Sequence, residues 1–346
     1  MNRRRLFLDE APGEVRGVVT LDDRPERLLL WRDGDEPRLA AGARVAARVA
    51  DVEPAIATAF LDLGAGAEAI LSFRPDERPV RGQLIEAEIR SEPRQDKLAT
   101  VRALGPCEGG PRLLAPAPSI AQQLQAIAPE ADLLRGPASW AVADEAECEA
   151  LEVEHALAGG GTIAIEPTRA LTAIDVDVGS RKGADAKRVT RQANLAALGT
   201  AARLLRLKGL GGLVVVDLAG RGHDGAALLA AARTAFAPDN PGVAIGPIGR
   251  FGTIELTIPR RARPVIERLL GDDGAISART LAQRLIRRLR AEAAAQPGAR
   301  LAAVCAPVVA AAVESLLPQL TDVVGARVEL AADPAFPRER LEVSAR

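Results

Sequence analysis

The sequence predicts a multidomain α/β protein in which a small β-barrel precedes alternating strands and helices. The chain has 346 residues, which is too long for one ordinary hydrophobic core, so two or three domains are expected. Between residues 36 and 105, short apolar segments are separated by Gly, Pro and Asp, as in a barrel of short strands. From residue 119 onward, apolar residues recur with the period of a helix.

The composition is typical of a soluble globular protein, with 48% hydrophobic and 26% charged residues. Aromatic residues make up only 2% and Tyr is absent, so aliphatic side chains must fill the cores. A net charge of −1 gives no overall attraction to nucleic acid or to an anionic membrane, and such a partner would need a local basic face. Three clusters are candidates, although each alone is more typical of a solvated helix face or tail: Arg3–Arg5, Arg260–Arg263 and Arg284–Arg290.

The cysteines and the apolar segments indicate a cytoplasmic location. Cys107, Cys148 and Cys305 form no Cys-x-x-Cys motif, so neither a disulfide framework nor a thiolate zinc site is expected. No segment approaches the roughly 18 uncharged apolar residues that span a membrane. The apolar stretch at the N-terminus is too short for a signal peptide.

The first strands and the barrel follow one another directly. Residues 1–35 contain three strand-like segments: Arg5–Leu8, Val15–Leu21 and Arg27–Trp31. Residues 36–105 contain five: Ala43–Val49, Ala57–Leu63, Ala69–Phe73, Gln83–Ile89 and Leu98–Leu104. Short strands at this spacing suit a Greek-key barrel of the OB type. Residues 106–118 are rich in Pro and Gly and are expected to form a linker.

The second half alternates between helices and strands. Residues 119–157 should hold a helix with Ile120, Leu124 and Ile127 on one face, and another over Glu145–Leu157. Residues 158–265 should contain strands Thr162–Glu166 and Ala170–Asp177, a helix over 187–208, strand Leu213–Val216, helix Asp224–Ala235, and strands Gly242–Ile248 and Thr253–Pro259. Residues 270–346 should form a small α/β unit with helix Ala278–Ala293, strand Leu301–Ala306, helix Pro307–Leu317, and strands near Val328 and Leu341.

Aspartates end two of these strands. The strand that carries Asp175 and Asp177, the long helix and the strand that ends in Asp217 form a β-α-β unit, whose strands run parallel. Side chains alternate along a strand, so Asp175 and Asp177 share a face. Open α/β sheets place ligands at the carboxyl ends of such strands. One or two carboxylates with several waters suit Mg²⁺, which can polarise a phosphodiester and activate water. The alternative is structural, because an Asp after an apolar strand often caps the next helix.

Other catalytic arrangements find little support in the sequence. Neither His155 nor His223 has a Ser or Cys nucleophile at a diagnostic spacing. The glycines of Gly209–Gly212 follow a helix and precede a strand, whereas nucleotide-binding loops run from strand to helix. These glycines should instead end the long helix.

Four motifs, in order and spacing, resemble the catalytic core of the RNase E/G family. They are Leu171-Thr-Ala-Ile-Asp175-Val-Asp177, Asn194-Leu195, the run LLRLKGLGGLVVVD from Leu204 to Asp217, and Gly249-Arg250-Phe251-Gly252. The resemblance is good over residues 160–265 and weaker on both sides. Thr58–Gly64 resembles part of the S1-type OB domain of that family, and the C-terminal unit resembles its small domain.

The resemblance implies a modular layout. Residues 1–35 and 119–157 would form an RNase H-like subdomain that is interrupted by the S1-type OB domain of residues 36–105. Residues 158–265 would form a DNase I-like catalytic subdomain, and residues 270–346 the small C-terminal domain.

The resemblance also implies an activity, namely Mg²⁺-dependent endonucleolytic cleavage of single-stranded RNA that leaves 5′-phosphate and 3′-hydroxyl ends. Asp175 and Asp217 match the metal-binding aspartates, and Asp177 stands at a third catalytic position. Phe60 matches an aromatic that stacks on RNA, although a place in the barrel core is an open alternative. Arg250 is expected to contact phosphate, with a structural ion pair as its alternative, and Lys97 is also assigned to RNA binding.

Four departures from the family pattern are visible. The third position is usually Asn and is Asp177 here, and a Glu that is common before this strand is Arg169. The short linker leaves no room for the segment that senses a 5′-monophosphate. Residues 262–277 contain no Cys or His, so no zinc-linked dimer is expected. These departures keep two alternatives open: a non-catalytic RNA-binding protein in RNA processing or ribosome assembly and, more weakly, a metal-dependent nuclease for DNA.

Overall fold

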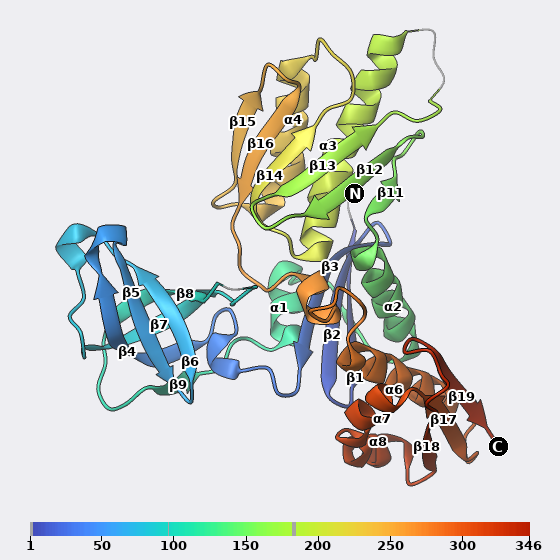
Figure 1. Ribbon diagram of the computed structural model, residues 1–346. Coiled ribbons are helices and arrows are strands. Elements are labelled where there is room, and N and C mark those ends of the chain that lie inside the picture. The colour runs from blue at the N-terminus through green and yellow to red at the C-terminus, as the bar shows by residue number, and fades with distance from the viewer. Residues whose placement is uncertain (1–2, 96, 182–184) are drawn as a thin grey trace.

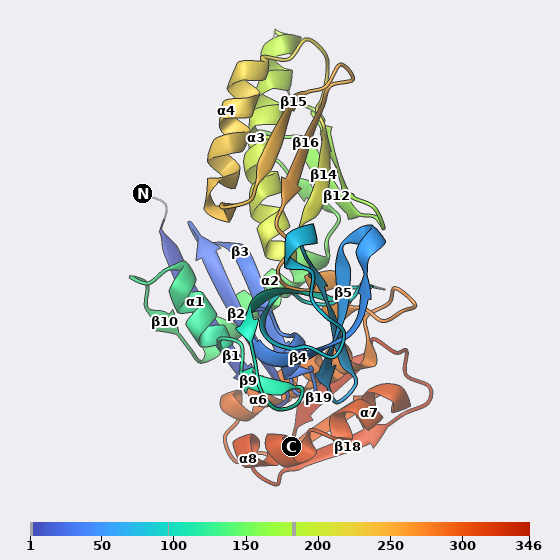
Figure 2. The same ribbon diagram turned by 90° about the vertical axis from the view of Figure 1, so that its left-hand side faces the viewer.

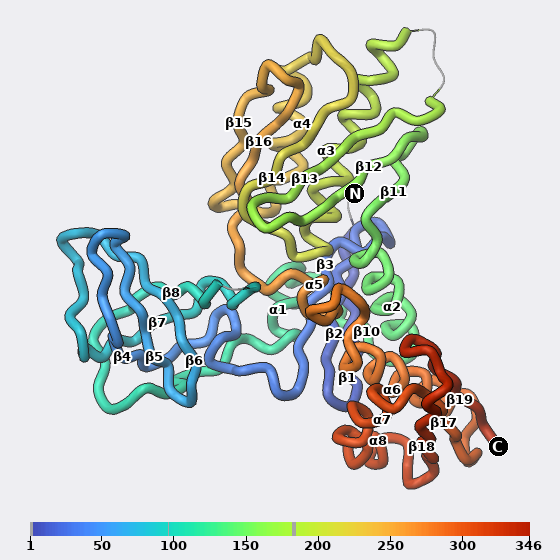
Figure 3. The backbone as a smooth tube through the Cα atoms, viewed as in Figure 1, coloured from blue at the N-terminus to red at the C-terminus, as the bar shows by residue number. Residues whose placement is uncertain are grey.

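The computed structural model describes residues 3–95, 97–181 and 185–346. Four units are visible in Figure 1: an N-terminal sheet, a barrel beside it, a larger sheet backed by two helices, and a small C-terminal unit. The tube in Figure 3 traces the chain as it leaves the N-terminal sheet, forms the barrel and returns to the sheet at α1. The mixed α/β architecture with an inserted barrel confirms the predicted fold class at this level.

The N-terminal sheet is covered on both faces. Its strands are β1 (Arg4–Ala11), β2 (Glu14–Leu21), β3 (Arg24–Arg32) and the short β10 (Leu133–Leu134), in the order β10-β1-β2-β3. Helix α1 (Ile120–Ile127) packs on Leu6 and Leu8, and helix α2 (Pro137–Leu151) belongs to the core on the other face, with Phe7. Gly17 lets α1 approach closely, since a Cβ there would lie 2.4 Å from Ile120 Cγ2.

The barrel closes as a ring of five strands, which faces the viewer in Figure 2. The strands are β4 (Arg44–Glu53), β5 (Thr58–Gly64), β6 (Ala67–Ser72), β7 (Leu84–Ser91) and β8 (Ala99–Pro106). The 3₁₀ turn η1 (Pro37–Leu39) precedes β4, η2 (Pro54–Ile56) lies between β4 and β5, and η3 (Pro75–Glu77) lies between β6 and β7. Pairing of β4 with β5 closes the ring, and all five predicted strands are present. The expected linker is not featureless, because β9 (Arg112–Ala115) pairs with β4.

The larger sheet has the strand order β11-β12-β13-β14-β16-β15. Its strands are β11 (Glu154–Ala156), β12 (Thr162–Pro167), β13 (Thr172–Asp177), β14 (Gly212–Asp217), β15 (Ala244–Ile248) and β16 (Thr253–Ile258). As predicted, β13 and β14 are parallel neighbours. Helices α3 (Ala186–Lys208) and α4 (Gly225–Phe236), the latter followed by η4 (Ala237–Asp239), lie on one face of the sheet, which leaves the opposite face open (Figure 1).

The long helix α3 has a capping residue at each end. Asp185 caps it by accepting a hydrogen bond from the Lys187 backbone N–H at 3.0 Å. Gly209 ends it in the left-handed conformation, with φ +65°. The expected helix over Glu145–Leu157 is wrong at its C-terminal end: α2 stops at Leu151, and residues 154–156 form the edge strand β11, which pairs with β12.

Helix α5 (Val265–Leu269) follows the larger sheet and buries Val265 and Leu269 in the core that this sheet shares with α2. The C-terminal unit contains α6 (Ala278–Ala295), β17 (Leu301–Cys305), α7 (Pro307–Glu314), α8 (Leu317–Val324), β18 (Val328–Ala332) and β19 (Leu341–Ala345). The single helix expected over Pro307–Leu317 is in fact divided, because the chain breaks between α7 and α8. Within the described ranges, no single helix is long and apolar enough to cross a membrane, and α7 and α8 meet such a test only as a pair bent by 70°.

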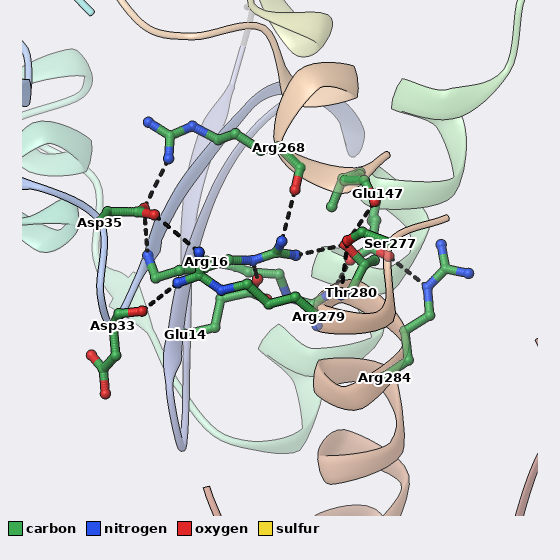
Figure 4. Close-up of polar contacts among 12 residues, drawn as sticks. Glu14, Arg16, Asp33, Asp35, Glu147, Arg268, Ser277, Arg279, Thr280 and Arg284 are labelled. Carbon is green, nitrogen blue, oxygen red and sulfur yellow. Dashed lines mark hydrogen bonds and ion pairs between the residues drawn. The ribbon is translucent and has the colours of Figure 1, made fainter. Parts of the chain in front are cut away.

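Buried ion pairs join the C-terminal unit to the N-terminal sheet. Arg287 and Arg290 on α6 reach Asp9 on β1 at 3.2 and 3.1 Å. Figure 4 shows Arg284 of α6 against Glu147 of α2, an ion pair of 2.8 Å. Arg284, Arg287 and Arg290 of the basic cluster therefore make ion pairs inside the protein, and Arg288 alone of the four is exposed, so the cluster is not an exposed basic face.

Candidate functional site

Asp175 and Asp217, here called the carboxylate pair, stand side by side on the open face of the larger sheet. They are register partners on the parallel strands β13 and β14, so their Cα atoms are about 5 Å apart. Ile174 and Val216, one residue before each, are buried under the helices, which places both carboxylates on the exposed face. The β-α-β unit thus brings together the two side chains that the sequence analysis singled out.

Neither carboxylate serves as a helix cap. Asp185 caps α3 and Asp224 caps α4, so the structural alternative that we considered for the pair does not apply. Among the described residues, Asp175 and Asp217 have no hydrogen-bond or ion-pair partner. Two exposed carboxylates with free lone pairs form a donor set that fits Mg²⁺, which takes one or two protein carboxylates and keeps several waters.

Asp177 takes a different local role from the pair. Its Oδ1 accepts a hydrogen bond of 2.7 Å from the Gly179 backbone N–H and so fixes the turn after β13. In the described ranges, no group of three or more His, Cys, Asp or Glu side chains gathers in a metal-binding arrangement. The structure therefore offers a metal two adjacent carboxylates, with Asp177 one step along the same strand face.

A buried asparagine holds the chain that follows Asp217. Asn194 on α3 is fully buried; its Nδ2 donates to the Ala219 carbonyl, and its Oδ1 accepts from the Ala219 N–H, each at 3.0 Å. This double hydrogen bond anchors the loop two residues beyond the carboxylate pair. The sequence analysis noted Asn194 only as part of a motif, although an amide among the small apolar residues of a helix face was a usable signal for such a role.

The turn between β15 and β16, Gly249–Gly252, lies beside the carboxylate pair and is here called the hairpin tip. Its end is tied to the sheet because the Leu218 N–H donates to the Gly252 carbonyl at 3.1 Å. Thr253, the next residue, is the register partner of Asp217. The Arg250 guanidinium stacks over the Phe251 ring, 4.6 Å from its centre. No carboxylate pairs with Arg250 in the part of the chain that the structure describes, so the ion-pair alternative does not apply.

The barrel residues assigned to RNA lie at the other end of β14. Phe60 on β5 is 38% exposed and stands outside the barrel core. With the exposed Lys97 it lines a hollow of about 630 Å³ that Gly212 and Arg260 border from the larger sheet. Because β14 runs from Gly212 to Asp217, roughly 17 Å of strand separates this hollow from the carboxylate pair. The structure does not bring Phe60 and Lys97 into direct contact with the aspartates.

His155 lies against the backbone of α2's C-terminal end, and His223 lies beside the hairpin tip. His155 Nε2 lies 3.2 Å from the Glu152 carbonyl oxygen, and burial, helped by the charge of Lys208, lowers the pKa of its imidazole. His223 lies under the hairpin tip: a Cβ on Gly252 would be 3.1 Å from His223 Nε2. This contact explains why the tip needs glycine at position 252, which also has a φ of +88°.

The structure is that of a mixed α/β protein with a closed five-stranded barrel, in which two carboxylates lie side by side at the ends of parallel strands. Strand ends of this kind are where open α/β sheets place ligands. Residues 132–261 match the model of the Ribonuclease E/G family. Over this segment the chain is similar to the RNase E/G family, the resemblance that the motifs indicated.

Individual relatives agree with this assignment. Ribonuclease E of Haemophilus influenzae is 38% identical over 114 residues, which cover 32% of this chain and 12% of that protein. Ribonuclease E of Nostoc sp. is 36% identical over 127 residues, 36% of this chain and 18% of that protein. The chloroplastic Ribonuclease E/G-like protein of Arabidopsis thaliana is 31% identical over 121 residues, 34% of this chain and 12% of that protein. This chain thus matches only a small part of each of these relatives.

Proposed function

We propose that this protein is a Mg²⁺-dependent endoribonuclease that cleaves single-stranded RNA in RNA processing or decay. One observation carries the proposal: Asp175 and Asp217 are adjacent and exposed in the segment that matches the RNase E/G family, and neither has a partner among the residues that the structure describes. A carboxylate pair that the fold leaves unneutralised on an open face is suited to binding a hard cation. The cytoplasmic location expected from the sequence belongs to the same proposal.

Asp175 and Asp217 would hold the ion. When bound, Mg²⁺ would supply charge neutralisation at the phosphodiester and a lowered pKa for the attacking water. Attack of this water on phosphorus with departure of the 3′-oxygen, which takes up a proton, would give 5′-phosphate and 3′-hydroxyl ends. Asn194 keeps the end of β14 in place through the Ala219 backbone, so that Asp217 is held in position. Asp177 uses Oδ1 for the Gly179 turn and keeps Oδ2 for a water molecule. Arg250, without a carboxylate partner, is available to a phosphate.

The RNA would extend from the carboxylate pair along the open face toward the barrel. The hollow at Phe60 and Lys97 lies roughly 17 Å away along β14, which is several nucleotides of an extended strand. Phe60 would stack on a base there, and Lys97 would neutralise phosphate. RNA binding should therefore weaken steeply as the salt concentration rises.

A second candidate function is non-catalytic RNA binding with the same fold. Asp177, in place of the usual Asn, adds a negative charge on the strand that carries Asp175, and this charge opposes an approaching phosphate. A protein of this kind would bind RNA in processing or ribosome assembly without cleaving it. A third, a DNA nuclease, would use the same carboxylate pair.

One experiment separates these candidates. Labelled single-stranded RNA and DNA are incubated with the protein in Mg²⁺ or EDTA, alongside Asp175→Asn, Asp217→Asn and the matched control Asp272→Asn. Asp272 is an exposed aspartate in the C-terminal unit. The proposal expects Mg²⁺-dependent cleavage of RNA that both site variants lose and the control keeps. RNA that is bound but intact would support the non-catalytic function, and cleavage that survives both site substitutions would exclude this site.

A further inference from the structure

The hairpin tip exposes an aromatic ring in a chain that has few. The sequence holds six Phe, two Trp and no Tyr. Of these rings, Phe251 is 78% exposed, more than any other large hydrophobic side chain in the described ranges. Phenylalanine is usually buried, and a ring held in water next to a candidate site suggests a ligand with a flat apolar face.

Backbone hydrogen bonds hold the turn that carries the ring. The Gly252 N–H donates to the Gly249 carbonyl at 3.0 Å and the Gly249 N–H to the Thr253 carbonyl at 2.8 Å, which closes a tight turn around Arg250 and Phe251. The bond from Leu218 to Gly252 then fastens this turn to the end of β14. Arg250 stacks on one side of the ring, so a ligand would reach its other side.

The ring is also near the carboxylate pair. Thr253 is directly opposite Asp217 in the sheet, and antiparallel partners have Cα atoms about 5 Å apart. Phe251 precedes Thr253 by two residues, which span at most about 7 Å. The Phe251 backbone therefore lies within about 12 Å of that of Asp217. A nucleotide bound at the aspartates would place its own base, or that of its neighbour, within reach of the ring.

We propose that Phe251 stacks on an RNA base close to Asp175 and Asp217, while Arg250 contacts the phosphate backbone beside that base. The inference rests on the proposed function and adds a base-binding position to it. Every nucleobase has a π face, so this position accepts single-stranded RNA with little sequence preference. The arginine favours RNA over an apolar protein partner, because the exposed surface at the tip is one ring beside one cation and not an extended apolar patch.

The test is a binding measurement that does not require cleavage. Short single-stranded RNAs carry the fluorescent base 2-aminopurine, which is quenched by stacking, at successive positions, and they are titrated with protein in EDTA. The variants are Phe251→Ala and Phe251→Trp. The matched control is Phe336→Ala, because Phe336 in the C-terminal unit also stacks with an arginine, Arg340, at 4.5 Å.

The wild-type protein should quench the probe at one or two adjacent positions. Phe251→Ala should remove the part of that quenching that Phe60 does not supply and weaken RNA binding about 10-fold, Phe251→Trp should keep both, and Phe336→Ala should change neither. In cleavage assays Phe251→Ala should raise KM more than it lowers kcat, because the stack forms in the bound ground state. Unchanged quenching and binding in Phe251→Ala would overturn the stacking inference and leave the nuclease proposal standing. A wild-type protein that binds no RNA would overturn both.

Discussion

Arg16 on β2 and Asp9 on β1 form an ion pair of 2.8 Å in which both side chains are completely buried. Asp9 also meets Arg287 and Arg290 from α6, and Arg16 also meets Glu147 from α2 at 3.0 Å. The pair therefore joins three parts of the chain: the N-terminal sheet, the helix that packs on it and the C-terminal unit. In Figure 4 the same contact region continues through Arg268 and Arg279, which both reach Asp35.

Substitution of Asp9 should destabilise the protein strongly. Asp9→Asn leaves the buried arginines around this position without their shared counter-charge, and breaking a buried ion pair in this way costs about 3–5 kcal/mol. The free energy of unfolding, measured by denaturant titration, checks the prediction. Asp23→Asn breaks the exposed pair with Arg5 and should have little effect. Equal stabilities for the two variants would contradict the role given to Asp9.

Acid should weaken the buried ion pairs of Asp9 and so lower the stability of the protein. Burial alone would raise the pKa of the Asp9 carboxyl, but the charges of Arg16 and Arg287 outweigh it, so the folded-state pKa lies below the ordinary 3.8. The unfolded chain therefore takes up this proton first as the pH falls. The stabilisation by Asp9 is present above about pH 4 and is lost as the pH drops through the lowered pKa. Unfolding measured from pH 6 to 2 should show a steeper loss for wild type than for Asp9→Asn.

The sequence predicted the parts of the fold that depend on local periodicity. The unit from β13 through α3 to β14 was expected from three local patterns. The residues of β14 form an apolar run that ends in Asp217, the apolar residues of α3 recur every three to four positions, and Gly209 follows the helix. Strand β9 was missed because its pairing with β4 uses backbone groups in a segment rich in Pro and Gly. Strand β11 was taken for helix because three residues are too few to show an alternation.

Some features of the candidate site could likewise be predicted from local sequence patterns, and others could not. Alternation and parallel pairing were enough to predict that Asp175 and Asp217 share one edge of the sheet. The bond between Asn194 and Ala219 joins residues 25 positions apart and has no local signature beyond an amide on an apolar helix face. The separation of Phe60 from the aspartates depends on how the barrel packs beside the larger sheet, which no local pattern specifies.

Asn194 should support metal binding without touching the ion. Asn194→Leu removes both hydrogen bonds to Ala219 and leaves that backbone without its partners, which costs about 1–3 kcal/mol of stability. Release of the loop after Asp217 should also raise the Mg²⁺ concentration needed for half-maximal cleavage. A Mg²⁺ titration at a temperature where the variant is folded measures this effect. If the variant unfolds earlier but needs no more Mg²⁺, the role of Asn194 is in stability alone.

The extra charge of Asp177 should strengthen the attraction for Mg²⁺ and oppose RNA. Asp177→Asn keeps an oxygen to accept the Gly179 N–H, so the turn and the fold should persist. Removing one negative charge near the carboxylate pair should raise the Mg²⁺ requirement and lower the KM for RNA. Circular dichroism controls for folding, and steady-state kinetics at several Mg²⁺ concentrations separate the two effects. If the Mg²⁺ requirement and the KM for RNA both rise, or both fall, Asp177 acts through structure and not through its charge.

The protein should be indifferent to the 5′ end of its substrate. Residues 106–118, where a segment that senses a 5′-monophosphate would stand, contain only β9, whose backbone pairs with the barrel. No additional subdomain is inserted between β8 and α1 in the structure. RNAs that differ only in a 5′-triphosphate, monophosphate or hydroxyl should therefore be cleaved with values of kcat/KM within about 2-fold of one another, a difference well below 1 kcal/mol. A preference of 10-fold or more for the monophosphate would reveal a 5′-end pocket built from other parts of the chain.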